Sequence, residues 1–196
     1  MYHDKMLGAL EAVLFAAGEP LTVAELAQCL QLDKPQVWEL LSHLEQSYEE
    51  EARGLMLRQV ADGYQLVTKP VHYNVVSNLG RKKEVKLTNA AMETLAIIAF
   101  KQPITKQEIE HIRGVRIEKI MSKLLEMELI RELGRKDTIG RPILYGTTDT
   151  FLQCFGLNDI SDLPELPEAD RSILEHEQLD LFAEAELPEQ EQESEE

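Results

Sequence analysis

The fold is decided by two similar stretches of sequence, AAGEPLTVAEL at residues 16–26 and AFKQPITKQEI at residues 99–109. In each stretch an apolar run ends, a proline begins a short connection, and Thr-x-x-Glu opens a new helix. The Thr-x-x-Glu pattern is a capping box, in which the threonine hydroxyl and the glutamate carboxylate satisfy free backbone N–H groups. Two such matches in similar settings indicate an internal repeat, and therefore a chain built from two related halves.

A further helix follows each copy of the repeat. Asp33 and Pro35 are the expected N-cap and first-turn residue of one such helix. Apolar residues at helical spacing then predict a buried stripe on each helix. The two stripes consist of Val37, Leu40, Leu41 and Leu44, and of Ile117, Ile120, Met121, Leu124 and Leu125.

A β-hairpin is predicted after each set of three helices. Leu57–Ala61 and Tyr64–Thr68 flank Asp62-Gly63, which is typical of a two-residue hairpin turn. Ile130–Leu133 and Ile143–Thr147 flank a longer loop at residues 134–142. Three helices followed by a hairpin is the winged-helix plan. The expected fold class is therefore mainly α with small β-hairpins (α+β), as two tandem winged-helix domains followed by a disordered acidic tail.

The domain boundaries follow from changes in composition. Residues 1–80 form the first expected domain, closed by a short helix at Val71–Leu79, and the polar residues 81–86 form a linker. Residues 87–164 form the second domain. Residues 165–196 hold thirteen acids and one base, with few apolar residues, so we expect them to be disordered. The alternative for the tail is a short motif between Ile173 and Phe182 that folds on a partner.

The sequence lacks the motifs of the common enzyme classes. It contains no phosphate-binding G-x-x-x-x-G-K-[ST] loop and no G-x-S-x-G elbow, although two carboxylates could still meet in the fold. The five histidines are scattered, and Cys29 and Cys154 each stand alone. We therefore expect no catalytic activity, no metal and no cofactor. Unpaired cysteines, no run of about eighteen apolar residues and no secretory signal indicate a cytoplasmic protein without a membrane span.

The balance of acidic and basic residues differs between the two predicted domains. Residues 1–80 hold five bases and eleven acids, whereas residues 81–157 hold fourteen bases and ten acids. The candidate nucleic-acid surface lies in the second half and consists of Arg116, Lys119, Lys123, Arg135 and Lys136. The neighbouring glutamates make an ordinary charged helix face the alternative, so we expect DNA binding to be weak and salt-sensitive at most. The competing function is a winged-helix DNA-binding transcriptional regulator.

Two features of the first predicted domain, residues 1–80, are compatible with either core packing or a subunit interface. Trp38, the single tryptophan, lies beside the predicted stripe and either packs under the hairpin or anchors an interface. The opening helix carries Leu7, Leu10, Leu14 and Phe15, which suit a domain core or a dimer contact.

Long motifs of the chain closely resemble the ScpB family, segregation and condensation protein B. The resemblance covers about residues 5–166, and the tail lies outside it. Phe100 departs from the family's usual tyrosine but keeps the ring. The motifs that carry it are Glu11–Phe15, Glu19–Leu21, Glu93–Thr105, Ile112–Val115, Gly134–Asp137, Gly140–Thr148, Phe151, Phe155–Leu157 and Asp162–Pro164.

The resemblance implies a non-catalytic subunit of a bacterial SMC–kleisin complex, acting in chromosome condensation and segregation during cell division. It implies two winged-helix domains, a homodimer through the first, and binding to the kleisin ScpA, which links the subunit to the SMC ATPase. DNA contact is then weak or indirect, and the protein is nucleoid-associated.

The second domain is the expected docking surface for a kleisin segment. Its wing loop, residues 134–142, carries glycine and proline, and Asp137 can pair with Arg135 or Arg141 to brace it. Leu144 and Tyr145 could instead fill the domain's own core. The candidate kleisin-binding residues are Phe100, Lys101, Ile139, Arg141, Leu144 and Tyr145.

Overall fold

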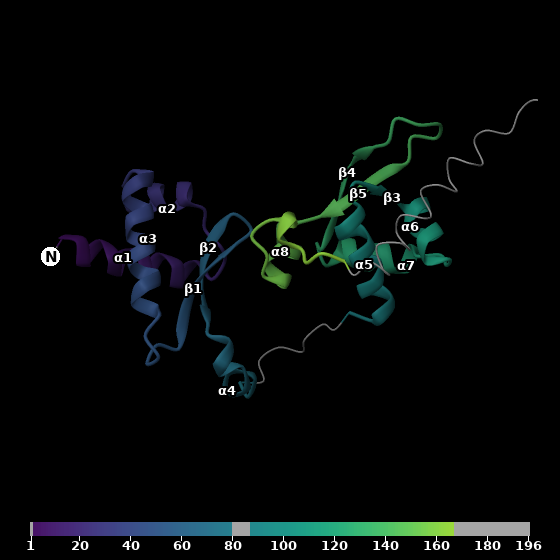
Figure 1. The fold of residues 1–196 in the computed structure, drawn as a ribbon. Helices are drawn as coiled ribbons and strands as arrows, with labels where there is room; N and C mark the ends of the chain where they lie inside the picture. The colour runs from purple at the N-terminus through teal and green to yellow at the C-terminus, as the bar shows by residue number, and fades with distance from the viewer. Residues whose placement is uncertain (1, 80–86, 167–196) are drawn as a thin grey trace, which may run out of the picture.

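The protein is a mixture of helices and two small antiparallel sheets in a computed structural model that describes residues 2–79 and 87–166. We call these two ranges the first half and the second half (Figure 1). The predicted linker 81–86 and nearly all of the predicted tail lie outside the described residues. The first half contains α1 (Tyr2–Ala17), α2 (Val23–Leu30), α3 (Lys34–Tyr48), β1 (Leu55–Val60), β2 (Gly63–Thr68), the 3-10 helix η1 (Pro70–His72) and α4 (Tyr73–Ser77).

The starts of α2 and α3 are fixed by side chains, as the sequence predicts. Thr22 Oγ1 accepts a hydrogen bond from the Glu25 backbone N–H, and the Glu25 carboxylate accepts one from the Thr22 N–H. Asp33 caps α3 in the same reciprocal way with Gln36. Each box satisfies backbone donors that the first helical turn leaves unpaired.

The hairpin of the first half turns one residue earlier than predicted. Val60 pairs with Gly63, so Ala61 and Asp62 form the two-residue turn, both with positive φ. Gly63 lies inside β2 instead. A Cβ at that position would sit 3.0 Å from Pro20 Cβ and 3.1 Å from the Leu21 backbone, to which Tyr64 is hydrogen-bonded in an isolated bridge. Gly63 lacks a Cβ and therefore allows β2 to approach Pro20 and Leu21 closely. The turn then falls on the two preceding residues, Ala61 and Asp62.

The predicted stripe of α3 is fully buried. It packs with residues of α1, α2 and β1 into one core. The buried members of this first core are Leu10, Leu14, Leu26, Val37, Leu40, Leu41, Leu44, Tyr48 and Leu57.

The second half repeats the order of three helices and a hairpin, with additions. The Thr105–Glu108 capping box opens its second helix, as predicted. Ile117, Met121 and Leu124 are buried, while Ile120 and Leu125 pack against them from partly exposed positions. The elements are α5 (Asn89–Lys101), β3 (Ile104–Thr105), α6 (Lys106–Arg113), α7 (Glu118–Glu126), β4 (Ile130–Arg135), β5 (Ile143–Thr147), α8 (Asp149–Phe155) and η2 (Ile160–Asp162).

A third strand, β3, was not predicted. Ile104 and Thr105 pair with Tyr145 and Leu144, which gives a sheet in the order β3-β5-β4. The side chain of Gln102 reinforces this junction, because its oxygen accepts a hydrogen bond from the Thr147 backbone N–H at 2.7 Å. The end of α5 is thereby fastened to β5.

Candidate functional site

The wing loop between β4 and β5 is held by its own backbone and by one arginine. Lys136 N–H donates to the Pro142 carbonyl at 2.8 Å, and Arg141 N–H donates to the Thr138 carbonyl at 2.9 Å. The Arg135 guanidinium donates to the Arg141 carbonyl at 2.9 Å. Asp137 forms neither predicted pairing, with Arg135 or with Arg141. The Arg135 guanidinium is bound to the Arg141 carbonyl instead, and backbone hydrogen bonds close the loop.

The predicted kleisin residues on the hairpin differ in exposure. Ile139 is fully exposed at the loop, and Arg141 is exposed beside it. Leu144 and Tyr145 are half-buried on β5. Tyr145 packs against the core of the second half, and its burial raises the pKa of its hydroxyl. Tyr145 therefore contributes to the core, as one predicted alternative has it, and part of its side chain stays accessible.

Phe100 and Lys101, at the end of α5, belong to a different part of the surface. Phe100 lines a groove of about 430 Å³ together with Ala99, Gln102, Ile160, Leu163 and Pro164. Neither Ile139 nor Arg141 lines this groove. The structure thus places four of the six candidate residues on the hairpin and Phe100 in a groove that sequence reasoning missed, while Lys101 ends α5 without lining that groove. Its far wall comes from a segment about 60 positions away along the chain.

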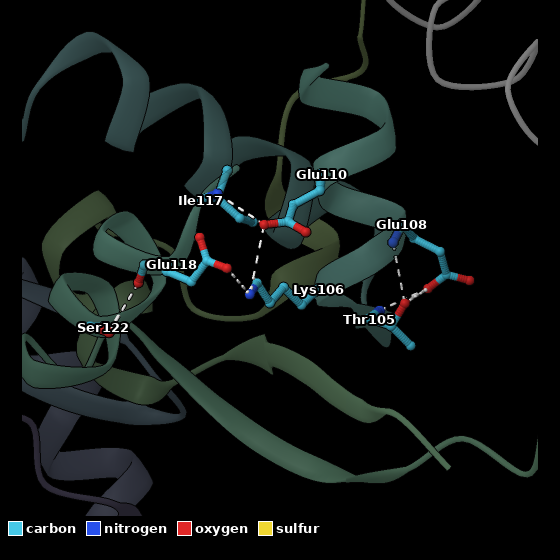
Figure 2. A network of polar contacts seen from close by, with 7 residues as sticks. All are labelled: Thr105, Lys106, Glu108, Glu110, Ile117, Glu118 and Ser122. Atoms are coloured by element: carbon cyan, nitrogen blue, oxygen red, sulfur yellow. Dashed lines mark hydrogen bonds and ion pairs between the residues drawn. The ribbon is translucent and has the colours of Figure 1, made fainter. Parts of the chain in front are cut away.

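The junction of α6 and α7 is held by acidic side chains and one lysine (Figure 2). Lys106 Nζ lies 2.7 Å from Glu118 Oε1 and 3.7 Å from Glu110 Oε1. Glu110 Oε1 also accepts a hydrogen bond from the Ile117 backbone N–H at 3.0 Å. The hydrogen bond from Lys106 holds the pKa of Glu118 below its ordinary value. Two carboxylates therefore occupy the start of α7, where the helix dipole favours negative charge.

Most of the predicted nucleic-acid surface is engaged within the chain. Lys123 Nζ lies 3.0 Å from Glu126 Oε2, and Lys136 Nζ lies 2.6 Å from Glu108 Oε1. Arg135 is bound to the wing backbone. Arg116, which precedes α7, and Lys119, in its first turn, are exposed. The basic side chains of this face are thus interleaved with carboxylates, which reduces the positive potential available to a phosphate backbone.

In the first half, Trp38 both packs and remains accessible. Its ring meets Tyr64 of the hairpin edge-on, with centroids 5.8 Å apart, yet Trp38 is 48% exposed. On α1, Leu10 and Leu14 are core residues, whereas Phe15 is 75% exposed beside a hollow that also involves Leu55 and Leu66. The opening helix thus contributes Leu10 and Leu14 to the core and leaves the Phe15 side chain outside.

No group of three His, Cys, Asp or Glu side chains in residues 2–79 and 87–166 is placed to hold a metal ion. No helix within those ranges is long and apolar enough to cross a membrane. Cys29 and Cys154 are unpaired and exposed.

Known proteins resemble the chain over most of its length. A family model described as "Segregation and condensation complex subunit ScpB" matches residues 8–166. "Segregation and condensation protein B" of Desulforamulus reducens is 45% identical over 181 residues, covering 92% of this chain and 98% of that protein. The protein of the same name from Moorella thermoacetica is 46% identical over 167 residues, covering 85% of this chain and 86% of the relative.

Solved structures are also similar. The crystal structure of ScpB from Mycobacterium tuberculosis is 30% identical, with a TM-score of 0.38, over 79% of this chain and 97% of that one. A dimer of the ScpB N-terminal domain complexed with ScpA peptide is 26% identical, with a TM-score of 0.39, over 40% of this chain and 99% of that one. On the family model and the near full-length relatives, the chain belongs to the ScpB family of segregation and condensation complex subunits.

Proposed function

We propose that this protein is a non-catalytic subunit of a bacterial SMC–kleisin complex that condenses and segregates chromosomes, binding the kleisin ScpA and reaching the SMC ATPase through it. One observation carries the proposal: the family match spans residues 8–166, and relatives named segregation and condensation protein B align over nearly their whole length. The protein then works in the cytoplasm at the nucleoid.

The proposed division of labour follows the two halves. Residues 1–80 are a winged-helix domain that forms the homodimer, and residues 87–164 are a winged-helix domain that binds the kleisin. Residues 81–86 are the linker and residues 165–196 a disordered acidic tail. The repeated order of three helices and a hairpin supports the pair of domains, and the separate core of each half supports the boundary.

The charges favour a protein partner over DNA. In helix-turn-helix proteins the start of the recognition helix contacts base edges. In this chain the start of α7 carries Glu118 and receives Glu110, and carboxylates at that place repel phosphates. Arg116 and Lys119 are the observation that favours the second candidate, a DNA-binding transcriptional regulator.

Calorimetry with a ScpA fragment tests the proposal. A double variant, Arg141→Glu with Tyr145→Ala, reverses one exposed charge and removes one half-buried ring on the proposed kleisin surface. We expect it to abolish binding. The control, Arg116→Glu with Lys119→Glu, reverses two charges at the start of α7 and should bind ScpA like the wild type. Equal affinity of the first variant and the wild type would move the kleisin site to another surface.

DNA binding separates the two candidates. A regulator binds duplex DNA alone, tightly and with sequence preference, at physiological salt. We expect only weak binding, which disappears between about 50 and 200 mM salt because it depends on a few phosphate contacts. Fluorescence anisotropy with a labelled duplex measures this, and tight selective binding would favour the regulator.

A further inference from the structure

The helix α5 carries apolar side chains on both of its faces. Glu93 and Lys101 are the only charged residues in its sequence, and a helix that is apolar all round is typically covered on every side. The inner face, through Leu95, Ile98 and Ala99, belongs to the core of the second half. The outer face is not covered by the described residues, so its apolar side chains are accessible.

Three residues of the outer face form a continuous line. Met92, Ala96 and Phe100 recur at intervals of four within α5, which places their side chains one above another along the helix. Met92 is 44% exposed, Ala96 is exposed and Phe100 is half-buried. We call these three residues the α5 stripe.

The α5 stripe continues into the groove of about 430 Å³ beside Phe100, because Phe100 belongs to both. Stripe and groove together make one extended apolar surface, and such surfaces on soluble proteins mark binding sites. The far wall of the groove includes Leu163, Pro164 and Leu166. Leu166 is also the last described residue, so the rest of the chain continues from the rim of the groove.

The sequence beyond this rim contains side chains that match the surface. Residues 173–182, which we call the tail segment, hold five large apolar residues between acidic ones: Ile173, Leu174, Leu179, Leu181 and Phe182. Lys101, next to Phe100, forms no ion pair with another described residue and can therefore attract the acidic flanks of the segment. Glu165 also lines the groove, so apolar contact has to supply most of the attraction.

The tail segment is also tethered at a suitable distance. Seven steps along the chain separate Leu166 from Ile173 and span up to roughly 23 Å when extended. The α5 stripe is shorter, at about 12 Å from Phe100 to Met92. A short tether of this kind gives an effective concentration on the order of 1 mM, so that even weak apolar contacts keep a segment bound.

We propose that the tail segment, residues 173–182, docks on the α5 stripe and the adjoining groove of its own chain. This goes beyond the proposed function, because it gives one part of the acidic tail a binding place on the second half. Phe100 and Lys101 are candidate kleisin residues, so the docked segment limits access to that end of α5. A partner that binds there has to displace the tail segment first.

Disulfide formation in the full chain tests the proposal. Cys29 and Cys154, both exposed and unpaired, are first replaced by serine. Ala96→Cys then places a thiol in the middle of the α5 stripe, and Ala183→Cys places one directly after the tail segment. Under oxidised glutathione we expect these thiols to join at least ten times faster than in the matched control. The control is Ser122→Cys with Ala183→Cys, whose first thiol is exposed on α7, outside the stripe and the groove.

A second variant separates docking from the effect of the tether. Leu181→Ser with Phe182→Ser, added to the protein with Ala96→Cys and Ala183→Cys, removes two apolar side chains and leaves the tether unchanged. We expect disulfide formation to slow at least tenfold, to the rate of the Ser122→Cys control. An unchanged rate would overturn the docking, as would equal rates at positions 96 and 122. Mass spectrometry identifies the linked positions, and a disulfide that joins two chains would overturn the proposal by assigning the surface to a second copy.

Discussion

The backbone N–H of Asp62 donates a hydrogen bond to Asn158 Oδ1 at 3.1 Å, across 96 positions of the chain. The adjacent Ala61 N–H donates to the Leu157 carbonyl at the same distance. The turn of the first hairpin therefore meets the segment after α8 (Figure 1). The left-handed conformation of both turn residues aims their N–H groups at this segment. These contacts fasten the two halves to each other.

Removing the Asn158 acceptor should loosen the two halves. Asn158→Leu keeps the size of the side chain but leaves the Asp62 N–H without its partner. Cys29 and Cys154 are exposed, unpaired and in opposite halves, so spin labels on these native thiols report the distance between the halves. We expect double electron–electron resonance to show a broader distance distribution in the variant.

The measurement needs two controls. Labelled protein is diluted into unlabelled protein, so that only distances within one copy count. Asn158→Asp keeps the accepting oxygen and should preserve the narrow distribution. A distribution as narrow in Asn158→Leu as in the wild type would show that the contact does not restrain the halves.

The capping boxes at Thr22 and Thr105 should differ in their contribution to stability. Thr105 is 2% exposed, and its hydroxyl donates to Glu108 Oε2 at 2.7 Å. Thr105→Val retains the shape but leaves the Glu108 backbone N–H without its acceptor, so we expect a loss of about 1–2 kcal/mol in unfolding free energy. Thr22→Val, at the more exposed equivalent position, should cost less. Urea unfolding measures both, and an equal cost would contradict the dependence on burial.

The Glu108–Lys136 ion pair should make stability depend on pH. Burial alone would raise the pKa of Glu108, but hydrogen bonds from Lys136 and Thr105 hold it below the ordinary value of 4.5. A lowered pKa means that the contribution is present above about pH 4.5 and disappears as pH falls through the folded-state value.

Glu108→Gln isolates this effect because the amide oxygen can still accept the capping hydrogen bond. We expect a loss of about 1 kcal/mol at pH 7, since Lys136 is partly exposed, and a difference from the wild type that shrinks in acid. Glu25→Gln is the matched control, since none of the described residues forms an ion pair with Glu25. Thermal unfolding from pH 7 to pH 3 provides the measurement, and a difference that grows in acid would contradict the assignment.

Gly63 should tolerate no side chain. A Cβ at Gly63 would press on Pro20 and the Leu21 backbone, so Gly63→Ala should cost about 1–3 kcal/mol through overpacking. Gly8 offers the opposite case, because it lies in α1 and a Cβ there meets nothing within 4 Å beyond its chain neighbours and the backbone of its own helix. Gly8→Ala should stabilise the protein by up to about 1 kcal/mol. Denaturation curves of the two variants measure the predicted loss of stability for Gly63→Ala and the predicted gain for Gly8→Ala.

The sequence by itself determined the local elements. The capping boxes at Thr22 and Thr105, the N-cap at Asp33 and the buried stripe of α3 depend on residues within a few positions of one another. Helical periodicity and capping chemistry are local, so they can be read along the chain. The two-fold repetition followed from the same signals, as did the hairpin strands to within two residues.

Tertiary structure alone decided the features that join distant residues. The early turn at Ala61 and Asp62 results from the packing of Gly63 on Pro20, and β3 exists because Ile104 finds Tyr145 some 40 positions later. The predicted site residues lie on separate surfaces because their positions also depend on contacts between distant segments. Phe100 meets its groove partners only in the folded chain, and Lys136, predicted to belong to a basic face, is paired with Glu108 of α6. Such contacts depend on how elements pack against one another, which periodicity along a single element does not encode.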